Sequence, residues 1–196
     1  EHRNELKAAL ALLNSAPELS AYPDLAASVA RDERVDPVLA KVLERTTPSE
    51  RDSYGRLVLA VREGRCQKAA QVLLSRLDEM PSPTVKAYCL RAAATAGLMV
   101  DPQCNALLNS SKDLIVLSHT LETSLFQRVP LDPTVIEEAI LRTTDYIPWA
   151  AEALILASPV RARKFFKQAL SGTASGSSAA WSSALHGLAR LGDGGV

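Results

Sequence analysis

The sequence predicts an all-α protein, and three observations support this prediction. First, Ala and Leu are abundant while aromatic residues make up only 5% of the 196 residues, and Ala and Leu are strong helix formers. Second, proline repeatedly follows a residue that can cap the N-terminus of a helix. Third, apolar residues recur at helical spacing, and no stretch rich in Val, Ile or Tyr alternates with the two-residue period of a strand.

Helix starts are marked by five dipeptides in which Asp, Ser or Thr precedes proline. The side-chain oxygen of the first residue can accept a hydrogen bond from an N–H of the first helical turn, and the proline has no N–H to leave unpaired. We therefore predict a helix N-cap at the first residue of each pair. The pairs are Asp36-Pro37, Thr47-Pro48, Ser82-Pro83, Asp101-Pro102 and Asp132-Pro133.

The helices of the first half follow from these starts and from the apolar spacing. Helix 65–79 has the clearest pattern, because its apolar residues fall on one face and its polar residues on the other. The inner face is Cys66, Ala69, Ala70, Leu73, Leu74 and Leu77, and the outer face is Arg65, Lys68, Gln71, Ser75 and Asp78. The predicted ranges in this half are 2–15, 23–33, 37–46, 49–62, 65–79 and 83–98.

The second half shows the same spacing. A small and polar stretch, SGTASGSS (171–178), predicts a flexible loop before the last helix. That helix carries its predicted apolar face at Trp181, Ala184, Leu185, Leu188 and Leu191. The other inner faces include Leu114, Leu117, Leu121 and Leu125; Val135, Ile136, Ala139 and Ile140; and Ala162, Phe165, Phe166 and Ala169. The predicted ranges are 102–109, 112–127, 133–144, 148–157, 160–170 and 178–191.

Most predicted connections are short, so successive helices should lie antiparallel as hairpins. One segment, GRCQKAAQVLLSRLDEMP, resembles the second half of a tetratricopeptide repeat. Gly64 stands at the turn between the helices, the small Ala69 and then Leu73 follow, and Pro81 ends the unit. Arg76 departs from the pattern, which prefers a small residue at that position, and the preceding helix lacks the usual aromatic residue.

Three further segments are similar to HEAT repeats, which favour Pro-x-Val-Arg before a helix of small residues. These are SPTVKAYCLRAAATAG, DPTVIEEAI and SPVRARKFF. The end of the chain, with Leu188, Leu191 and the Gly192-Asp193 pair, resembles the close of a HEAT second helix. However, the prolines of the three segments stand at positions 83, 133 and 159, so they follow no single period.

Both resemblances imply an α-solenoid, in which short antiparallel helix pairs stack side by side. An irregular helical bundle is the alternative, because the proline starts have no fixed period. We expect residues 1–196 to form a single helical-repeat domain. The chain begins with Glu1 rather than Met, so we expect it to be part of a larger chain or a processed protein.

Residues that carry out catalysis or bind metal are sparse. The three histidines do not stand at metal-binding spacings, and the sequence has no nucleophile or phosphate-binding motif. We therefore expect no metal, no cofactor and no enzymatic activity. The alternative is a helical enzyme whose site would need Asp145, Glu152 and His119 to meet in space.

The isolated histidines and cysteines have structural interpretations. We expect His119 to be a partly buried structural residue, and His186 to be solvated beside Arg190. The cysteines stand far apart and beside apolar residues, which favours buried free thiols, although one disulfide stays possible. They are Cys66, Cys89 and Cys104.

The chain has no net charge, but its charges are unevenly distributed. Arg161, Arg163, Lys164 and Lys167 form a basic cluster on one predicted helix. This cluster could bind an acidic partner or phosphates, which would make the chain a nucleic-acid-binding helical repeat. The simpler interpretation is a solvated outer face, opposite the predicted inner Phe165 and Phe166.

The two tryptophans, Trp149 and Trp181, have two interpretations. Core packing is the default, because Trp buries a large apolar area. Alternatively, either residue could be an aromatic anchor on a binding surface, since interface hot spots are rich in Trp.

The function that we expect is a non-enzymatic interaction module, which binds a partner protein or peptide on a helical-repeat surface. Its candidate binding residues are the four basic residues and the two tryptophans. No apolar run is long enough to span a membrane. Free cysteines favour the cytoplasm, with a processed or periplasmic domain as the alternative.

Overall fold

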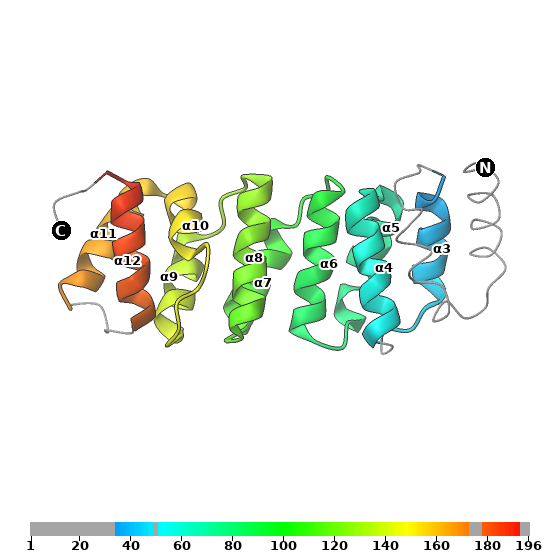
Figure 1. The fold of residues 1–196 in the computed structure, drawn as a ribbon, viewed down its shortest axis with the longest axis horizontal. Coiled ribbons are helices and arrows are strands. Elements are labelled where there is room, and N and C mark those ends of the chain that lie inside the picture. The colour runs from blue at the N-terminus through cyan, green and yellow to red at the C-terminus, as the bar shows by residue number, and fades with distance from the viewer. Residues whose placement is uncertain (1–33, 49–50, 173–177, 193–196) are drawn as a thin grey trace. The chain divides into compact units, whose positions relative to one another are not determined.

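The computed structural model describes residues 34–48, 51–172 and 178–192, and these residues are helical throughout, with short connections and no strand. The prediction of an all-α protein is therefore confirmed (Figure 1). The predicted helices 2–15 and 23–33 lie outside the described residues, as does most of the predicted loop 171–178.

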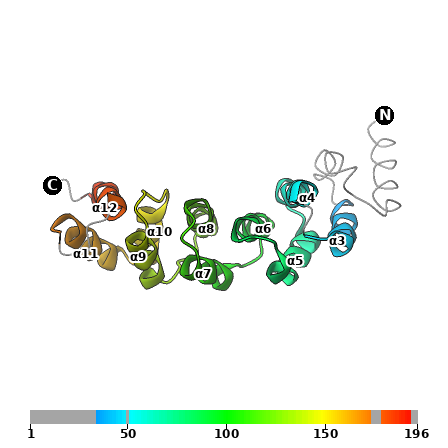
Figure 2. The same ribbon diagram turned by 90° about the horizontal axis from the view of Figure 1, so that it is seen from below.

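The chain divides into two compact units, which meet in sequence at Met99 and Val100. In the first unit, each helix packs most closely against the helix two places along the chain: α3 against α5, and α4 against α6. The helices of this unit thus form two layers (Figure 2). They are α3 (Asp36–Arg45), α4 (Arg51–Gly64), α5 (Gln67–Ser75) and α6 (Pro83–Thr95), with the 3-10 turn η2 (Leu77–Glu79).

The second unit has the same layering. Its odd-numbered helices contact one another in order, α7 with α9 and α9 with α11, and so do α8, α10 and α12. Each odd-numbered helix also packs on the even-numbered helix that follows it. The helices are α7 (Asp101–Ser110), α8 (Leu114–Gln127), α9 (Pro133–Arg142), α10 (Ala150–Ala157), α11 (Pro159–Leu170) and α12 (Ser178–Arg190).

Two of the predicted N-caps are confirmed. The Ser82 hydroxyl accepts a hydrogen bond from the Val85 N–H, and the Asp132 carboxylate accepts one from the Thr134 N–H. The predictions for Asp36 and Asp101 are wrong, because both residues lie inside the first turn of their helices and neither side chain caps its own helix. The Thr47-Pro48 pair is followed by residues outside the described ranges.

Asp36 caps a different helix from the one it begins. Its carboxylate accepts hydrogen bonds from the N–H groups of Lys68 (2.9 Å) and Ala69 (2.8 Å) in the first turn of α5. The residue at the N-cap of α5, Cys66, makes no side-chain cap bond of its own. Asp36 thus supplies an acceptor that the local sequence lacks, and it joins the beginnings of α3 and α5.

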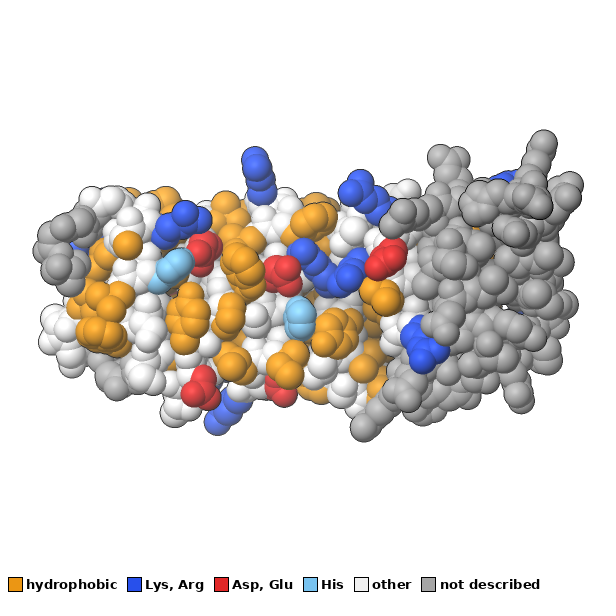
Figure 3. All heavy atoms as spheres, in the orientation of Figure 1, with side chains coloured by type: hydrophobic (Ala, Val, Ile, Leu, Met, Phe, Trp, Pro, Cys, Tyr) orange, Lys and Arg blue, Asp and Glu red, His pale blue; other side chains and the backbone are white. Residues whose placement is uncertain are grey.

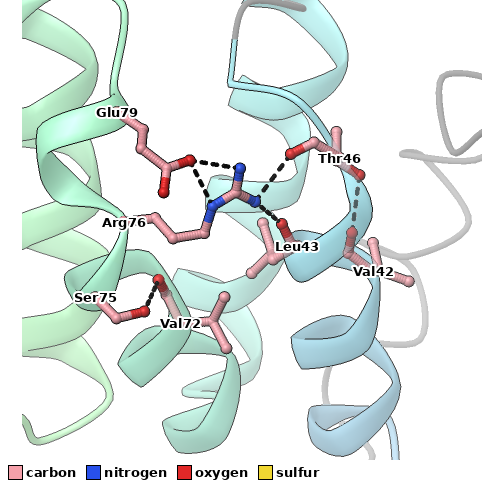
Figure 4. A network of polar contacts seen from close by, with 7 residues as sticks. All are labelled: Val42, Leu43, Thr46, Val72, Ser75, Arg76 and Glu79. Carbon is pink, nitrogen blue, oxygen red and sulfur yellow. Dashed lines mark hydrogen bonds and ion pairs between the residues drawn. The ribbon is translucent and has the colours of Figure 1, made fainter.

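Arg76 joins the other ends of the same two helices (Figure 4). Its guanidinium donates to the carbonyl oxygens of Leu43 and of Thr46 (3.0 Å) at the end of α3. It also donates to the Glu79 carboxylate at 2.9 and 2.7 Å, and this hydrogen bond raises the pKa of Arg76. Arg76 therefore has a structural role, because a small residue at this position could not reach the carbonyls at the end of α3.

An equivalent clamp joins α7 and α9 in the second unit. Arg142, the last residue of α9, donates to the carbonyl oxygens of Asn109 (2.5 Å) and Leu108 near the end of α7. At the other end of this pair, the Asn105 side chain accepts a hydrogen bond from the Asp132 N–H at 3.1 Å. Both units therefore use an arginine at the end of one helix to cap the helix two places before it.

The residues predicted to face the core do so in α5, but the prediction is partly wrong for α12. In α5, the inner apolar residues are buried or half-buried, and the polar residues are exposed. In α12, Ala184 and Leu188 are buried, but Trp181 and Leu185 are exposed. Small residues form most of the contact face of α12, because this helix approaches α11 closely. They are Ala179, Ala180, Ser183, Ala184 and Gly187.

Candidate interaction surfaces

Exposed apolar side chains are concentrated on the even-numbered helices. Thirteen large hydrophobic side chains are exposed among the described residues; eight lie on even-numbered helices and two on odd-numbered ones. Figure 3 shows such side chains at the surface of this layer in each unit. This distribution marks the even-numbered layer of each unit as the more apolar one, since scattered exposure would not prefer one layer. The eight are Leu59, Tyr88, Leu114, Ile115, Phe126, Leu156, Trp181 and Leu185.

A groove of about 260 Å³ lies between α4 and α6 in the first unit. Its walls are mainly apolar, and both charged residues that line it are arginines. The lining residues are Gly55, Val58, Leu59 and Arg62 from α4, and Val85, Tyr88 and Arg91 from α6. None of the patterns in the sequence predicted this groove. Leu59 and Tyr88 lie off the buried faces of their helices, and this displacement was the signal that could have revealed it.

The tryptophans do not pack fully into the core, so the default interpretation is wrong for both. Trp149 is 44% exposed and Trp181 is 53% exposed. Trp149 precedes α10 with a left-handed backbone, at φ 71°. A residue with a Cβ atom adopts this conformation at a cost of about 1–2 kcal/mol, so the fold holds a large aromatic side chain at the surface in a strained position.

The structure divides the predicted basic cluster. Arg161 forms a two-point contact with Glu137, with both N–O distances at 2.8 Å, and this hydrogen bond raises the pKa of Arg161. Arg163, Lys164 and Lys167 are exposed on α11. Part of the cluster is thus committed to joining α11 to α9, which reduces the positive charge available to a phosphate or an acidic partner.

The two described histidines each lie near a carboxylate. The His186 Nε2 atom is 2.6 Å from a Glu152 oxygen, so His186 is exposed as predicted but is also bonded to α10. His119, which is half-buried, lies 3.5 Å from a Glu122 oxygen on its own helix. Of the three residues considered for a catalytic site, Glu152 is therefore engaged with His186, and Asp145 is exposed after α9.

All three cysteines are buried free thiols, as expected. Burial raises the pKa of Cys66 to about 11 and that of Cys89 and Cys104 to about 12. Within the described ranges, no three or more His, Cys, Asp or Glu side chains come together in a way that could hold a metal ion. No helix among these residues is both long and apolar enough to cross a membrane.

Comparison of the chain with protein-family models, with characterised protein sequences and with solved structures gave no match.

Proposed function

We propose that this chain is a non-enzymatic protein–protein interaction module, built as a degenerate helical solenoid, that binds a partner through the exposed side chains of its even-numbered helices. The observation that carries the proposal is the concentration of exposed large apolar side chains on those helices. Exposed apolar patches promote non-specific association unless a partner protein covers them. Their concentration on these helices therefore favours a binding role.

The spacing of the helices supports the repeat interpretation. The odd-numbered helices begin at residues 36, 67, 101, 133 and 159, and the even-numbered ones at 51, 83, 114, 150 and 178. Most successive starts within each series are therefore 31–36 residues apart, close to the 34-residue period of tetratricopeptide repeats. The gap between the proline starts at 83 and 133 is long because Pro83 begins an even-numbered helix and Pro133 an odd-numbered one. Pro133 and Pro159 both begin odd-numbered helices, and their shorter separation departs from the period.

The long-range polar contacts support the same register. Arg76 donates to a carbonyl 33 residues earlier, and Arg142 does the same. His186 contacts a side chain 34 residues earlier. Within each unit, these contacts and the packing of each helix on the one two places away favour a solenoid over an irregular bundle.

Trp149 supports binding at the surface of the second unit. Strained backbone conformations persist where the surrounding structure enforces them, and they cluster at functional sites. Here the strained residue presents a half-exposed indole, a side chain that is enriched in interface hot spots. Trp181 adds a second exposed indole on α12.

The experiment that tests the proposal is an affinity capture from a lysate of the source organism, with the wild-type chain compared with a double variant, Trp149→Gly and Trp181→Ser. Glycine removes the indole and suits the left-handed backbone, so the fold should be retained. We expect specific proteins to be retained by the wild type and lost from the double variant. Nuclease treatment should not change what is retained.

A matched control is Val160→Ser, because Val160 is 80% exposed but lies on the odd-numbered helix α11. This variant should retain the same proteins as the wild type. The proposal fails if the wild type retains no protein specifically, or if the double variant retains every protein that the wild type does. Recovery of only nuclease-sensitive material would also overturn it, in favour of nucleic-acid binding.

A further inference from the structure

The groove between α4 and α6 has an apolar part and a basic part. Because α5 returns the chain between them, α4 and α6 run in the same direction (Figure 1). On both helices the arginine is the last of the lining residues: Arg62 follows Leu59 on α4, and Arg91 follows Tyr88 on α6. The two guanidinium-bearing residues therefore lie toward the same end of the groove, beyond its apolar walls.

The size of the groove limits what it can hold. Its volume of about 260 Å³ falls below the roughly 300–1,000 Å³ of typical small-molecule sites. The groove is therefore better suited to one apolar side chain of a partner than to a free cofactor or substrate.

Gly55 helps to form this space. A Cβ atom built at Gly55 would meet no atom within 4 Å, so the absence of a side chain leaves the groove open and is not required by packing of the core. Glycine within a helix costs about 1 kcal/mol relative to alanine.

We propose that the α4–α6 groove binds an acidic peptide segment of a partner protein, with one apolar side chain held between Leu59 and Tyr88 and a neighbouring Asp or Glu side chain paired with Arg62 and Arg91. Charge complementarity carries the choice of occupant, since no acidic residue lines the groove. Arginine suits this role because its planar donors can hold a carboxylate at two points. The inference rests on the proposed function and specifies the partner chemistry for one of its surfaces.

The test uses the full chain and an array of hexapeptides that are acetylated at the N-terminus and amidated at the C-terminus. Blocking the termini means that any carboxylate must come from a side chain. Each peptide carries a central Leu, Phe or Trp, flanked on either side by Asp and Glu, by Lys and Arg, or by Ser alone. Labelled hits are then titrated by fluorescence polarisation.

We expect only peptides that combine an apolar centre with acidic neighbours to bind, and their amide chemical-shift changes should map to α4 and α6. The double variant Arg62→Glu, Arg91→Glu should weaken binding at least about tenfold. The plug variant Gly55→Phe should abolish it without unfolding the chain. The charge-matched control is the double variant Lys112→Glu, Arg190→Glu, at two exposed positions of the second unit, and it should leave binding unchanged.

The inference is overturned if no acidic–apolar peptide binds, if serine-flanked peptides bind equally well, or if the Gly55→Phe variant binds as the wild type does. In those cases, the proposed function as an interaction module is retained if the lysate capture recovers specific proteins. If neither peptides nor lysate proteins are retained, the proposed function itself fails.

Discussion

Gly187 of α12 lies directly against the ring of Phe166 of α11. A Cβ atom at residue 187 would stand 2.1 Å from Phe166 Cε2, far inside the contact distance of two carbon atoms. Phe166 is fully buried, so its ring has no open space to move into. The close approach of these two helices therefore depends on the absence of a side chain at one position.

We predict that Gly187→Ala lowers the free energy of unfolding by about 1–3 kcal/mol, because overpacking forces a shift of the Phe166 ring or of α12. The better helix propensity of alanine, about 1 kcal/mol, offsets only part of this cost. Urea unfolding followed by circular dichroism measures the change. A second variant, Gly187→Ala with Phe166→Leu, should recover part of the lost stability, because the smaller side chain makes room for the methyl group.

The same substitution at Gly55 should have the opposite effect. A Cβ atom there meets open space, so alanine gains helix propensity without a clash. We predict that Gly55→Ala raises the free energy of unfolding by about 0.5–1 kcal/mol. Equal effects at residues 55 and 187 would contradict the packing described here.

Two Asp-Pro pairs that look alike in the sequence should differ in their contribution to stability. Asp36→Ala removes both acceptors for the Lys68 and Ala69 N–H groups, and we expect it to cost about 1–2 kcal/mol. Asp101→Ala removes no cap hydrogen bond of α7, so its cost should be at most a few tenths of a kcal/mol. Urea unfolding of both variants provides the comparison, and similar costs would argue against the cap from Asp36 to α5.

The guanidinium of Arg76 should matter for its shape as well as for its charge. Arg76→Lys keeps the positive charge near Glu79 but loses the planar donors that reach the end of α3, so we predict a loss of about 1–2 kcal/mol. Arg45→Lys, at an exposed position in the last turn of α3, is the matched control and should be nearly neutral. Hydrogen exchange would localise the effect, since amides at the end of α3 should exchange faster in the Arg76 variant.

The buried thiols should make the stability of the fold fall at high pH. Burial raises the thiol pKa of Cys89 and Cys104 from an ordinary value of 9.0 to about 12, so the unfolded chain loses these protons first. Their contribution is complete below about pH 9 and is lost as the pH rises toward 12. Each thiol contributes a slope of up to about 1.4 kcal/mol per pH unit in that window.

Unfolding free energies measured at pH 8 and pH 10.5 test this prediction. A Cys89→Ala variant should lose less stability than the wild type between the two values, because one titrating group is gone. A thiol reagent at pH 8 should label the unfolded chain quickly and the native chain slowly. Equal pH dependence in the variant and the wild type would contradict the proposed cause.

The local signals in this sequence were strong where one helix and its own neighbours decided the outcome. Ser82-Pro83 and Asp132-Pro133 mark helix starts as predicted, and the inner face of α5 follows its apolar spacing. Asp36-Pro37 has the same local pattern, but its carboxylate is used by α5, 32 residues away. No pattern within a single helix carries that information.

The candidate surfaces were harder to predict for the same reason. The apolar character of Trp181 and Leu185 places them on the predicted inner face of α12, yet small residues occupy that face because α11 lies so close. The groove between α4 and α6 combines residues that stand about 30 positions apart, so only the pairing of the two helices brings Leu59 and Tyr88 together.

The sequence by itself determined that the described part of this chain is helical and where most of its described helices begin and end. These features depend on hydrogen bonds and apolar spacing within one or two helical turns, which is the range over which residue order is informative. The tertiary structure alone decided which helices pair, which carbonyls Arg76 and Arg142 cap, and which apolar side chains are left exposed. Those outcomes depend on how closely helices distant in the sequence approach one another, and the sizes of the side chains on both partners set that distance together.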